Sequence, residues 1–434
     1  MYRVSVALAC ALGLSACLLP AARVAAEIPT LVSAARLILG SDQGVYVEAA
    51  DGSQLLAQAA SRPVHPASVS KVPTTLALLR KFGPDHRFAT TFSTSGAIVD
   101  GTLYGDLIVQ SEGDPSLVDE NALVIATRLR VAGIQRVVGG LRPVGTLTFD
   151  WQPDPDGTRM RAALSGHVSE AALAAVRALQ TVGSEATILP AATHTATEST
   201  PLTTAPLASI VFAEPGTWSD TDRARSALAP SAQPHPLLVH RSQPLLALAK
   251  SLNDYSNNIF KPLADQAGGA SAVQQLARAV LPESMRPEVT LGDGAGTDPR
   301  NRLSPRAAVR LLEVLDHELT AQGRNLTDIL PVAGIDPGTL QKRINGPHEV
   351  GRVVGKTGTF GDYGASALVG AVPTSDHGTV YFAILNHNVP VPEARRRQDR
   401  FVAVLLGQLH SSPWKYERDS RPAVQRAELV SLSP

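Results

Sequence analysis

The chain has 434 residues, of which 44% are hydrophobic and 18% charged, so it is long enough for more than one domain and apolar enough to bury a core. This composition excludes a disordered chain. The 39 basic and 39 acidic residues cancel at pH 7, which excludes the basic excess that attracts nucleic acids or anionic membrane surfaces.

The first segment along the chain is typical of an export signal. Arg3 precedes an apolar run over residues 4–19, and small residues continue to Ala26. Small side chains at the last and third-last positions favour cleavage after Ala26. We therefore expect residues 1–26 to be a signal peptide and the mature chain to be periplasmic or otherwise extracytoplasmic.

Two alternatives concern the same segment. Residues 14–17, Leu-Ser-Ala-Cys, resemble a lipobox, in which case Cys17 would carry a lipid anchor. An uncleaved membrane helix is disfavoured, because Pro20 and Arg23 follow an apolar run shorter than the roughly 20 residues that a span needs. Cys10 and Cys17 are the two cysteines of the chain, so cleavage after Ala26 leaves no disulfide and no thiolate metal ligand.

After the signal, residues 28–64 are predicted to form a short helix and then strands, with a hairpin turn at Asp51-Gly52. A helix is expected to start close to Ser68 and to end near Phe82. Its start is placed there because Pro73 lacks a backbone donor and is tolerated only in a first turn.

The middle of the chain changes character and is predicted to be a separate inserted lobe over residues 96–235. Segments with a strand-like pattern and glycine turns lie on both sides of one helical stretch at residues 120–134. A tract rich in Thr, Ala and Pro at residues 191–206 is predicted to be a loop. Asp114 could be structural or face a substrate, and we favour the structural interpretation.

Residues 27–95 and 236–410 are predicted to form one discontinuous domain. In its second part Ser304-Pro305 is a strong helix start, two apolar strands follow, and a final helix covers residues 392–410. The three arginines at 395–397 are interpreted as a solvated helix face. The polar residues 411–434 are expected to be a loose tail.

Three short motifs point to chemistry: S-x-x-K at residues 68–71, S-x-N at residues 256–258 and K-T-G at residues 356–358. Each motif is weak alone, because the chain also contains S-x-x-K at residues 412–415 and S-x-N at residues 251–253. The three motifs also occur in the order expected for serine enzymes of this motif class.

Context supports the copy at Ser68 and Lys71. The two residues lie three apart at the start of an apolar helix, and therefore share one face within hydrogen-bonding reach. The chain has only seven lysines among its 39 basic residues. A buried lysine loses its proton readily whereas an arginine does not, so lysine at position 71 indicates proton transfer.

The motifs and their flanking residues resemble the penicillin-binding D-alanyl-D-alanine carboxypeptidase/endopeptidase family, in particular its class C members with an inserted domain. Residues 65–92 and 353–372 are among the similar segments, and the likeness extends over most of the mature chain. The resemblance implies an α/β penicillin-recognising serine hydrolase fold, with an antiparallel sheet flanked by helices and an inserted α+β lobe.

The resemblance also implies roles for the motif residues. Ser68 would attack the D-Ala-D-Ala carbonyl and form an acyl-enzyme, Lys71 would act as its base, and Ser256 would relay the proton to the leaving amine. The oxyanion would lie between the backbone N–H groups of Ser68 and Thr359, where one donor contributes about 3 kcal/mol. The substrate-binding residues would be Asn258 for the amide and, around the terminal carboxylate, Lys356, Thr357, Gly358 and Thr359.

The implied partners are peptidoglycan stem peptides or cross-links, and β-lactams that acylate Ser68; no nucleic acid, cofactor or metal is expected. The family reads Asp-Gly-Ser-Gly where this chain has Asp293-Gly294-Ala295-Gly296, and Pro262 would kink a helix carrying the second motif. Two alternatives stay open: a weakly catalytic binding or scaffolding protein, and a β-lactamase or esterase relative. Neither the preferred bond nor the oligomeric state is readable from these residues.

Overall fold

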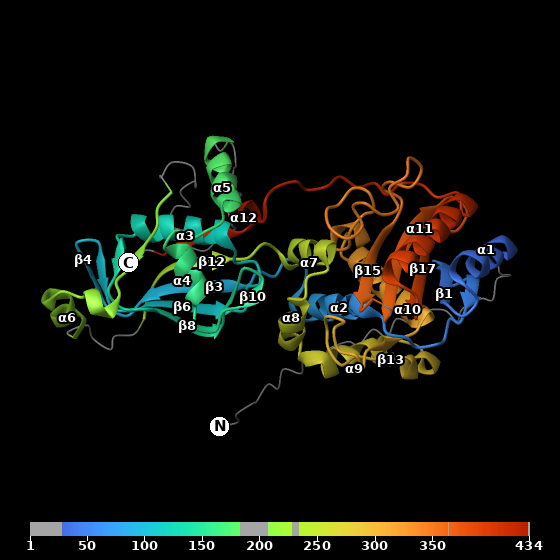
Figure 1. The fold of residues 1–434 in the computed structure, drawn as a ribbon, viewed down its shortest axis with the longest axis horizontal. Coiled ribbons are helices and arrows are strands. Elements are labelled where there is room, and N and C mark those ends of the chain that lie inside the picture. Colours follow the sequence, from blue (N-terminus) through green and yellow to red (C-terminus); the bar gives the residue numbers. More distant parts are fainter. Residues whose placement is uncertain (1–27, 183–206, 228–233, 363, 433–434) are drawn as a thin grey trace, which may run out of the picture.

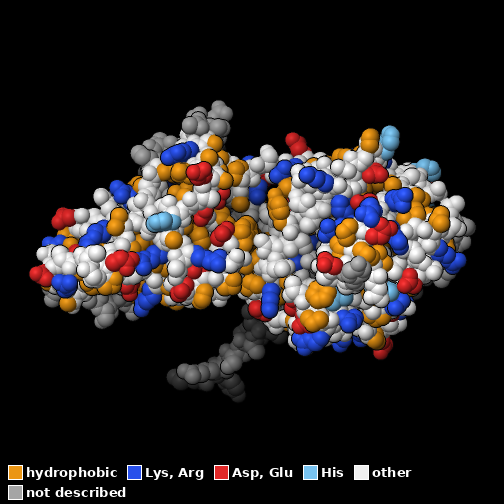
Figure 2. All heavy atoms as spheres, in the orientation of Figure 1, with side chains coloured by type: hydrophobic (Ala, Val, Ile, Leu, Met, Phe, Trp, Pro, Cys, Tyr) orange, Lys and Arg blue, Asp and Glu red, His pale blue; other side chains and the backbone are white. Residues whose placement is uncertain are grey.

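The computed structural model describes residues 28–182, 207–227, 234–362 and 364–432, so the signal-peptide and lipobox predictions lie outside the described residues. These residues form two lobes joined at one end, which we call the main lobe and the inserted lobe (Figure 1). Basic and acidic side chains are interspersed over the visible face of both lobes (Figure 2). Within the described ranges, no helix has both the length and the hydrophobicity needed to cross a bilayer.

The main lobe is built on a five-stranded antiparallel sheet in the order β15-β16-β17-β1-β2. The first and last strands of the main lobe are neighbours in this sheet, because β1 pairs with β17. The predicted hairpin is present, with Gly52 in a left-handed conformation between β1 and β2. The strands are β1 (Gly44–Ala49), β2 (Gln54–Gln58), β15 (Val354–Phe360), β16 (Ala365–Thr374) and β17 (Gly378–His387).

Helices cover both faces of this sheet, as the predicted fold class requires (Figure 1). Val45 and Val47 of β1 belong to the core under α1 and α11, whereas Tyr46 between them belongs to the core under α2 and α10, since successive strand residues face opposite sides. The helices are α1 (Pro29–Leu39), α2 (Lys71–Phe82), α7 (Leu245–Tyr255), α8 (Phe260–Gln266), α9 (Gly269–Val280), α10 (Pro305–Thr320) and α11 (Val391–Gln408).

Short elements complete the main lobe and place the motifs. The predicted start of α10 is confirmed, because the Ser304 side chain accepts a hydrogen bond from the N–H of Ala307 and Pro305 follows it. These short elements are η1 (Ala67–Ser70), η3 (Glu283–Glu288), η4 (Leu326–Asp328), β13 (Val289–Thr290) and β14 (Arg302–Leu303).

The inserted lobe is an α+β unit around a second sheet, in the order β18-β12-β3-β6-β8. Its strands are β3 (Ala89–Thr94), β6 (Leu107–Glu112), β8 (Leu141–Thr146), β12 (His235–Arg241) and β18 (Glu428–Ser431). Its helices are α3 (Asp119–Val131), α4 (Thr158–Leu164), α5 (Glu170–Val182) and α6 (Asp220–Ala227). Short strands and one turn complete it: β4 (Ala97–Val99), β5 (Thr102–Tyr104), β7 (Arg136–Val137), β9 (Thr148–Phe149), β10 (Gln152–Pro153), β11 (Val211–Phe212) and η2 (Pro215–Thr217).

The lobe boundaries differ from the predicted 96–235. Strand β3 enters the lobe and strand β12 leaves it, and the two pair with each other from Thr90 opposite His240 to Thr94 opposite His235. The sheet of the inserted lobe therefore includes β3, which was placed in the discontinuous domain, and all of β12. Pairing the entering and leaving strands satisfies their backbone groups where the insert joins the main lobe.

The C-terminal residues are not the loose tail that their polarity suggests. Residues 411–432, here called the strap, run from the main lobe to the inserted lobe (Figure 1). Trp414 and Tyr416 pack against the main core, and β18 pairs antiparallel with β12, with Val430 opposite Val239. Between them lies the short helix α12 (Ala423–Arg426). Only four residues form the strand, too few for a clear alternation in the sequence.

Candidate active site

The serine of the first motif lies in the 3-10 turn η1 rather than in the α-helix, which begins at Lys71. Ala67, just before Ser68, has a left-handed φ of 47°, so the chain turns sharply at this point. Lys71 Nζ lies 2.7 Å from Ser68 Oγ, as the spacing predicts. Pro73 falls in the first turn of α2, also as predicted.

Lys71 is fully buried, and its amine meets three oxygens. Besides Ser68 Oγ, these are Ala295 O at 2.6 Å and Asn258 Oδ1 at 3.3 Å. Burial lowers the pKa of Lys71 to about 7, an effect that the charge of Asp293 partly offsets. A neutral amine has two N–H groups for the carbonyl oxygens, which leaves its lone pair for the hydroxyl proton of Ser68.

The second motif occupies the turn between α7 and α8. Ser256 ends α7 with a left-handed φ of 55°, and Pro262 lies in the first turn of α8. The expectation that Pro262 would kink the helix carrying the motif is therefore wrong, because the motif precedes that helix and proline is tolerated in a first turn. Through Asn258 this turn contacts Lys71.

The third motif brings a second buried lysine to the same site. Lys356 on β15 is fully buried and donates to Ser256 Oγ at 2.9 Å and to Thr357 O at 2.9 Å. Burial lowers its pKa well below the usual value, the charge of Lys71 lowers it further, and Asp254 opposes both. The structure thus links all three motifs by side-chain hydrogen bonds.

Two glycines allow the backbone to close around Ser68. A Cβ on Gly358 would lie 2.7 Å from Pro66 O and 3.0 Å from Ser68 N. A Cβ on Gly296, whose φ is 87°, would lie 2.0 Å from Ala67 O. Both positions therefore require glycine, since a side chain would push β15 or the 293–296 loop away from Ser68.

Sequence reasoning missed the contribution of the 293–296 loop to the site. Asp293 folds it, accepting hydrogen bonds from the N–H groups of Gly296, Thr297 and Asp298. Burial raises the pKa of Asp293, but side-chain hydrogen bonds from Thr297 and Asn301 outweigh it, so the pKa is lowered. Ala295 then presents its carbonyl to Lys71 and to Ser68 Oγ, at 2.6 and 3.5 Å. Because this is a backbone group, the departure from the family at position 295 leaves the contact in place.

His65 is a second residue that the motifs did not reveal. Its Nδ1 accepts from the N–H of Ala67, and its Nε2 lies 3.0 Å from Asp298 O. These contacts place the proton on Nε2 of a neutral ring, and burial lowers the pKa of His65 accordingly. The ring stacks on Phe360 with centroids 3.9 Å apart. His65 therefore ties η1 to both the 293–298 loop and β15.

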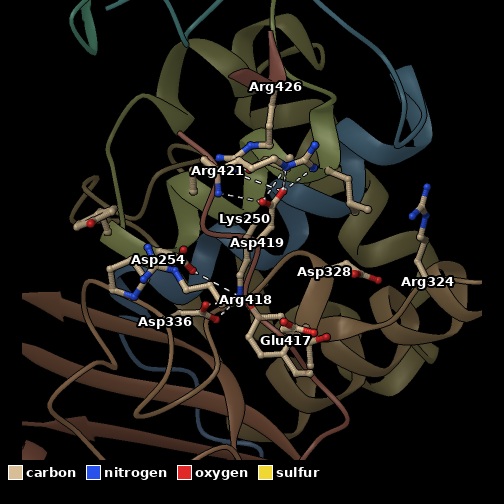
Figure 3. Close-up of a pocket in the computed structure, with 17 residues that line it drawn as sticks. Lys250, Asp254, Arg324, Asp328, Asp336, Glu417, Arg418, Asp419, Arg421 and Arg426 are labelled. Carbon is tan, nitrogen blue, oxygen red and sulfur yellow. Dashed lines mark hydrogen bonds and ion pairs between the residues drawn. The ribbon is translucent and has the colours of Figure 1, made fainter. Parts of the chain in front are cut away.

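A charged cavity of about 370 Å³ lies beside α7, next to the second motif (Figure 3). Lys250 and Asp254 of α7 line it, and Lys250 bridges to Asp336, which accepts from Tyr416 Oη at 2.7 Å. Burial raises the pKa of Asp254 to about 7, although Lys250 opposes it. None of the motif side chains lines the cavity. In the described ranges, no cluster of three or more His, Cys, Asp or Glu side chains is arranged to hold a metal ion.

Comparison with known proteins gives consistent results. The sequence profile of the D-Ala-D-Ala carboxypeptidase 3 (S13) family matches residues 25–204 and 213–407. The chain is 26% identical over 429 residues to the D-alanyl-D-alanine carboxypeptidase of Actinomadura sp. (strain R39), which covers 81% of this chain and 78% of that protein.

Two solved structures share the fold. Bd3459, a predatory peptidoglycan endopeptidase from Bdellovibrio bacteriovorus, has a TM-score of 0.65 at 19% identity, covering 90% of this chain and 99% of that one. Penicillin-binding protein 4 from Haemophilus influenzae has a TM-score of 0.56 at 18% identity, covering 88% and 99%. The predicted fold class is confirmed.

Proposed function

The chain belongs to the D-Ala-D-Ala carboxypeptidase 3 (S13) family of serine peptidases, and on this premise we propose that it hydrolyses D-Ala-D-Ala or D-Ala-containing bonds of peptidoglycan through an acyl-enzyme on Ser68. The observation that carries the proposal is the 2.7 Å contact between Ser68 Oγ and the buried amine of Lys71. A hydroxyl paired with a neutral amine is an activated nucleophile.

In the proposed reaction Ser68 Oγ bonds to the carbonyl carbon of the penultimate D-Ala while Lys71 accepts the hydroxyl proton. The C–N bond then breaks, and the proton passes from Lys71 through the hydroxyl of Ser256 to the leaving nitrogen. Ser256 Oγ accepts from Lys356, so its own proton is free for this transfer. Water afterwards cleaves the ester and restores Ser68.

The proposed substrates are stem peptides and cross-links of peptidoglycan, and β-lactams are proposed to acylate Ser68. The structural relative Bd3459 has been captured acylated by penicillin G, which supports acylation by β-lactams here. Since peptidoglycan lies outside the cytoplasm, we also propose that residues 1–26 direct export.

We favour this function over the alternative of a weakly catalytic binding protein. That alternative was motivated by the altered loop at residues 293–296 and by the second half of the insert, residues 151–234, for which the sequence motifs offer no likeness to the family. In the loop, Ala295 contributes its backbone carbonyl to the site. A β-lactamase relative would need a base for deacylation. Asp293 acts on the charge of Lys71, but both its carboxylate oxygens are hydrogen-bonded within their own loop.

The test is covalent labelling of the mature protein with a fluorescent penicillin, followed by peptide mass mapping and by hydrolysis of an acyl-D-Ala-D-Ala peptide. We expect an adduct on Ser68 that is absent in Ser68→Ala. In Lys71→Arg labelling should slow by roughly 10²- to 10⁴-fold, because a guanidinium does not accept the proton. Ser412→Ala, in the second S-x-x-K copy, is the matched control and should label normally. An adduct elsewhere, or none, would overturn the proposal.

A further inference from the structure

The three consecutive arginines of α11, predicted to form one solvated face, have different partners. Arg396 and Arg397 both pair with Glu393 on their own helix. Arg395 instead reaches β15, where its Nη2 donates to Thr359 Oγ1 at 2.8 Å. One member of the triplet therefore contacts a residue of the third motif.

The position of Arg395 is fixed by the docking of its helix. At the start of α11 the N–H of Val391 donates to Asp362 O at 2.9 Å, just after β15. Two turns further on, Gln398 donates to Asn386 Oδ1 at 2.8 Å and to Ser366 Oγ at 3.2 Å, which joins the helix to β17 and β16. These contacts flank Arg395 on both sides and hold its backbone beside the end of β15.

The charge of Arg395 is not neutralised by a neighbour. Within the described part of the chain it forms no ion pair, and the nearby carboxylate of Asp399 is bound by Arg343 at 2.6 Å. A guanidinium has five N–H groups, and the contact with Thr359 uses one of them. Donors and a full positive charge thus stay available at this edge of the site.

The contact also orients Thr359. Because its Oγ1 accepts from Arg395, its own O–H is free to donate to an anion. The other cation of this strand, Lys356, is fully buried next to Lys71, and two close cations in a buried site disfavour each other's charge. An arginine keeps its charge at every working pH and binds carboxylates in two-point geometry.

We propose that Arg395 is a specificity-determining residue, whose guanidinium acts with the Thr359 hydroxyl to bind the free α-carboxylate of the residue that leaves the acyl-enzyme. This inference rests on the proposed D,D-peptidase function and adds a preference to it. Peptides that end in a free carboxylate should be favoured over the same peptides ending in a neutral amide.

The test compares kcat/KM for an acyl-D-Ala-D-Ala peptide and for its C-terminal amide, in the wild type, Arg395→Gln, Arg395→Lys and the matched control Arg396→Gln. Removing a charge-assisted contact should lower kcat/KM for the free acid by about 10- to 100-fold and leave the amide within about twofold. Arg395→Lys should recover part of the loss, and Arg396→Gln should behave as wild type with both peptides.

A second substrate pair covers the case in which the amide is cleaved too slowly to measure. This pair is a penicillin and its carboxylate methyl ester. In Arg395→Gln, the rate of Ser68 acylation by the penicillin should fall by the same factor as kcat/KM for the free acid, and the rate with the methyl ester should stay within about twofold. If Arg395→Gln lowered the rates with charged and neutral substrates equally, or lowered neither, the proposed role of Arg395 would be overturned. Failure of the wild type to label or turn over would instead overturn the proposed function, so the two failures are distinguishable.

Discussion

Lys71 and Lys356 are two buried lysines that contact different serines. Both side chains are fully buried, yet Lys71 contacts the hydroxyl of Ser68 and Lys356 that of Ser256. Burial favours the neutral amine in each case, and the charge of Lys71 further lowers the pKa of Lys356. The site can therefore hold a base without a histidine.

This environment predicts the pH dependence of acylation. The amine is the working form of Lys71, and it predominates above the pKa of about 7. The rate of Ser68 labelling by penicillin should thus rise tenfold per pH unit below this value and level off above it. Stopped-flow labelling between pH 5 and 9 measures this rise and the plateau that follows it. Thermal unfolding at each pH is the control for stability. A rate independent of pH would contradict the assignment of Lys71 as base.

The contact between Ser68 and Lys71 could be predicted from the sequence, but the contacts of the surrounding residues could not. Ser68 and Lys71 lie in sequence at a spacing that fixes their contact in almost any helical turn. Ala295 contacts Lys71 through its backbone carbonyl. His65 accepts from the N–H of Ala67 and stacks on Phe360. Neither contact can be inferred from the residue type. Arg395 is three positions from Gln398 in a polar stretch, and only the docking of α11 gives it a partner on β15.

At the scale of elements, η1, β15 and the 293–296 loop pack so closely that positions 296 and 358 have no room for a side chain. Gly296 shows this most clearly, since its φ of 87° and the Ala67 carbonyl both require glycine. The helix start at Ser304 and the hairpin at Gly52 were predictable because their signals are local. The pairing of β3 with β12 was not, because it joins segments separated by the whole insert.

Gly296→Ala should therefore distort η1, the turn that carries Ser68. Its Cβ would overlap Ala67 O, so either η1 or the loop must move, and we expect labelling of Ser68 to slow by at least about tenfold. The matched control is Gly407→Ala on α11, whose new Cβ would meet nothing within 4 Å beyond its chain neighbours and the nearby backbone of its own helix. Labelling rates and melting temperatures of both variants test the idea; normal labelling in Gly296→Ala would contradict it.

A buried polar chain links elements of the inserted lobe. His240 of β12 lies 3.0 Å from Asp114 through Nδ1 and 3.0 Å from Asn121 of α3 through Nε2. Asp114→Ala would remove the close approach to His240 and the two hydrogen bonds that Asp114 Oδ1 accepts from the N–H and hydroxyl of Ser116, and should cost about 1–3 kcal/mol of unfolding free energy. Urea unfolding measures the loss. Ser68 labelling should persist in folded protein, and a selective loss of labelling would show that Asp114 faces the substrate.

At the scale of the whole molecule, the strap joins the two lobes. Tyr416 is bound to Asp336 of the main lobe, and Glu428 forms a 3.2 Å ion pair with Arg87, where the chain enters the inserted lobe. Arg87 also donates to Arg426 O, and Arg426 donates to Gln243 Oε1. The family profile ends at residue 407, so the strap lies beyond the matched residues.

Removing the second half of the strap should weaken the inserted lobe more than the site. Deletion of residues 420–434 takes away β18 and the Arg87 ion pair, and we expect unfolding to split into two calorimetric transitions, the lower one shifted by roughly 5 °C or more. Ser68 labelling at 25 °C should continue. Deletion of residues 433–434 alone is the control, and a single unshifted transition in the longer deletion would contradict the coupling.

The place of β18 at the edge of its sheet also bears on the order of synthesis. Every other strand of that sheet leaves the ribosome before β18 does, and until it arrives β12 is an edge strand with unpaired backbone groups. When β18 pairs, it covers this edge of β12, and the edge of the sheet becomes β18, which has only four residues. Without β18, two copies of the chain would each offer the other the seven-residue edge of β12, so the pairing of β18 protects this edge from intermolecular pairing.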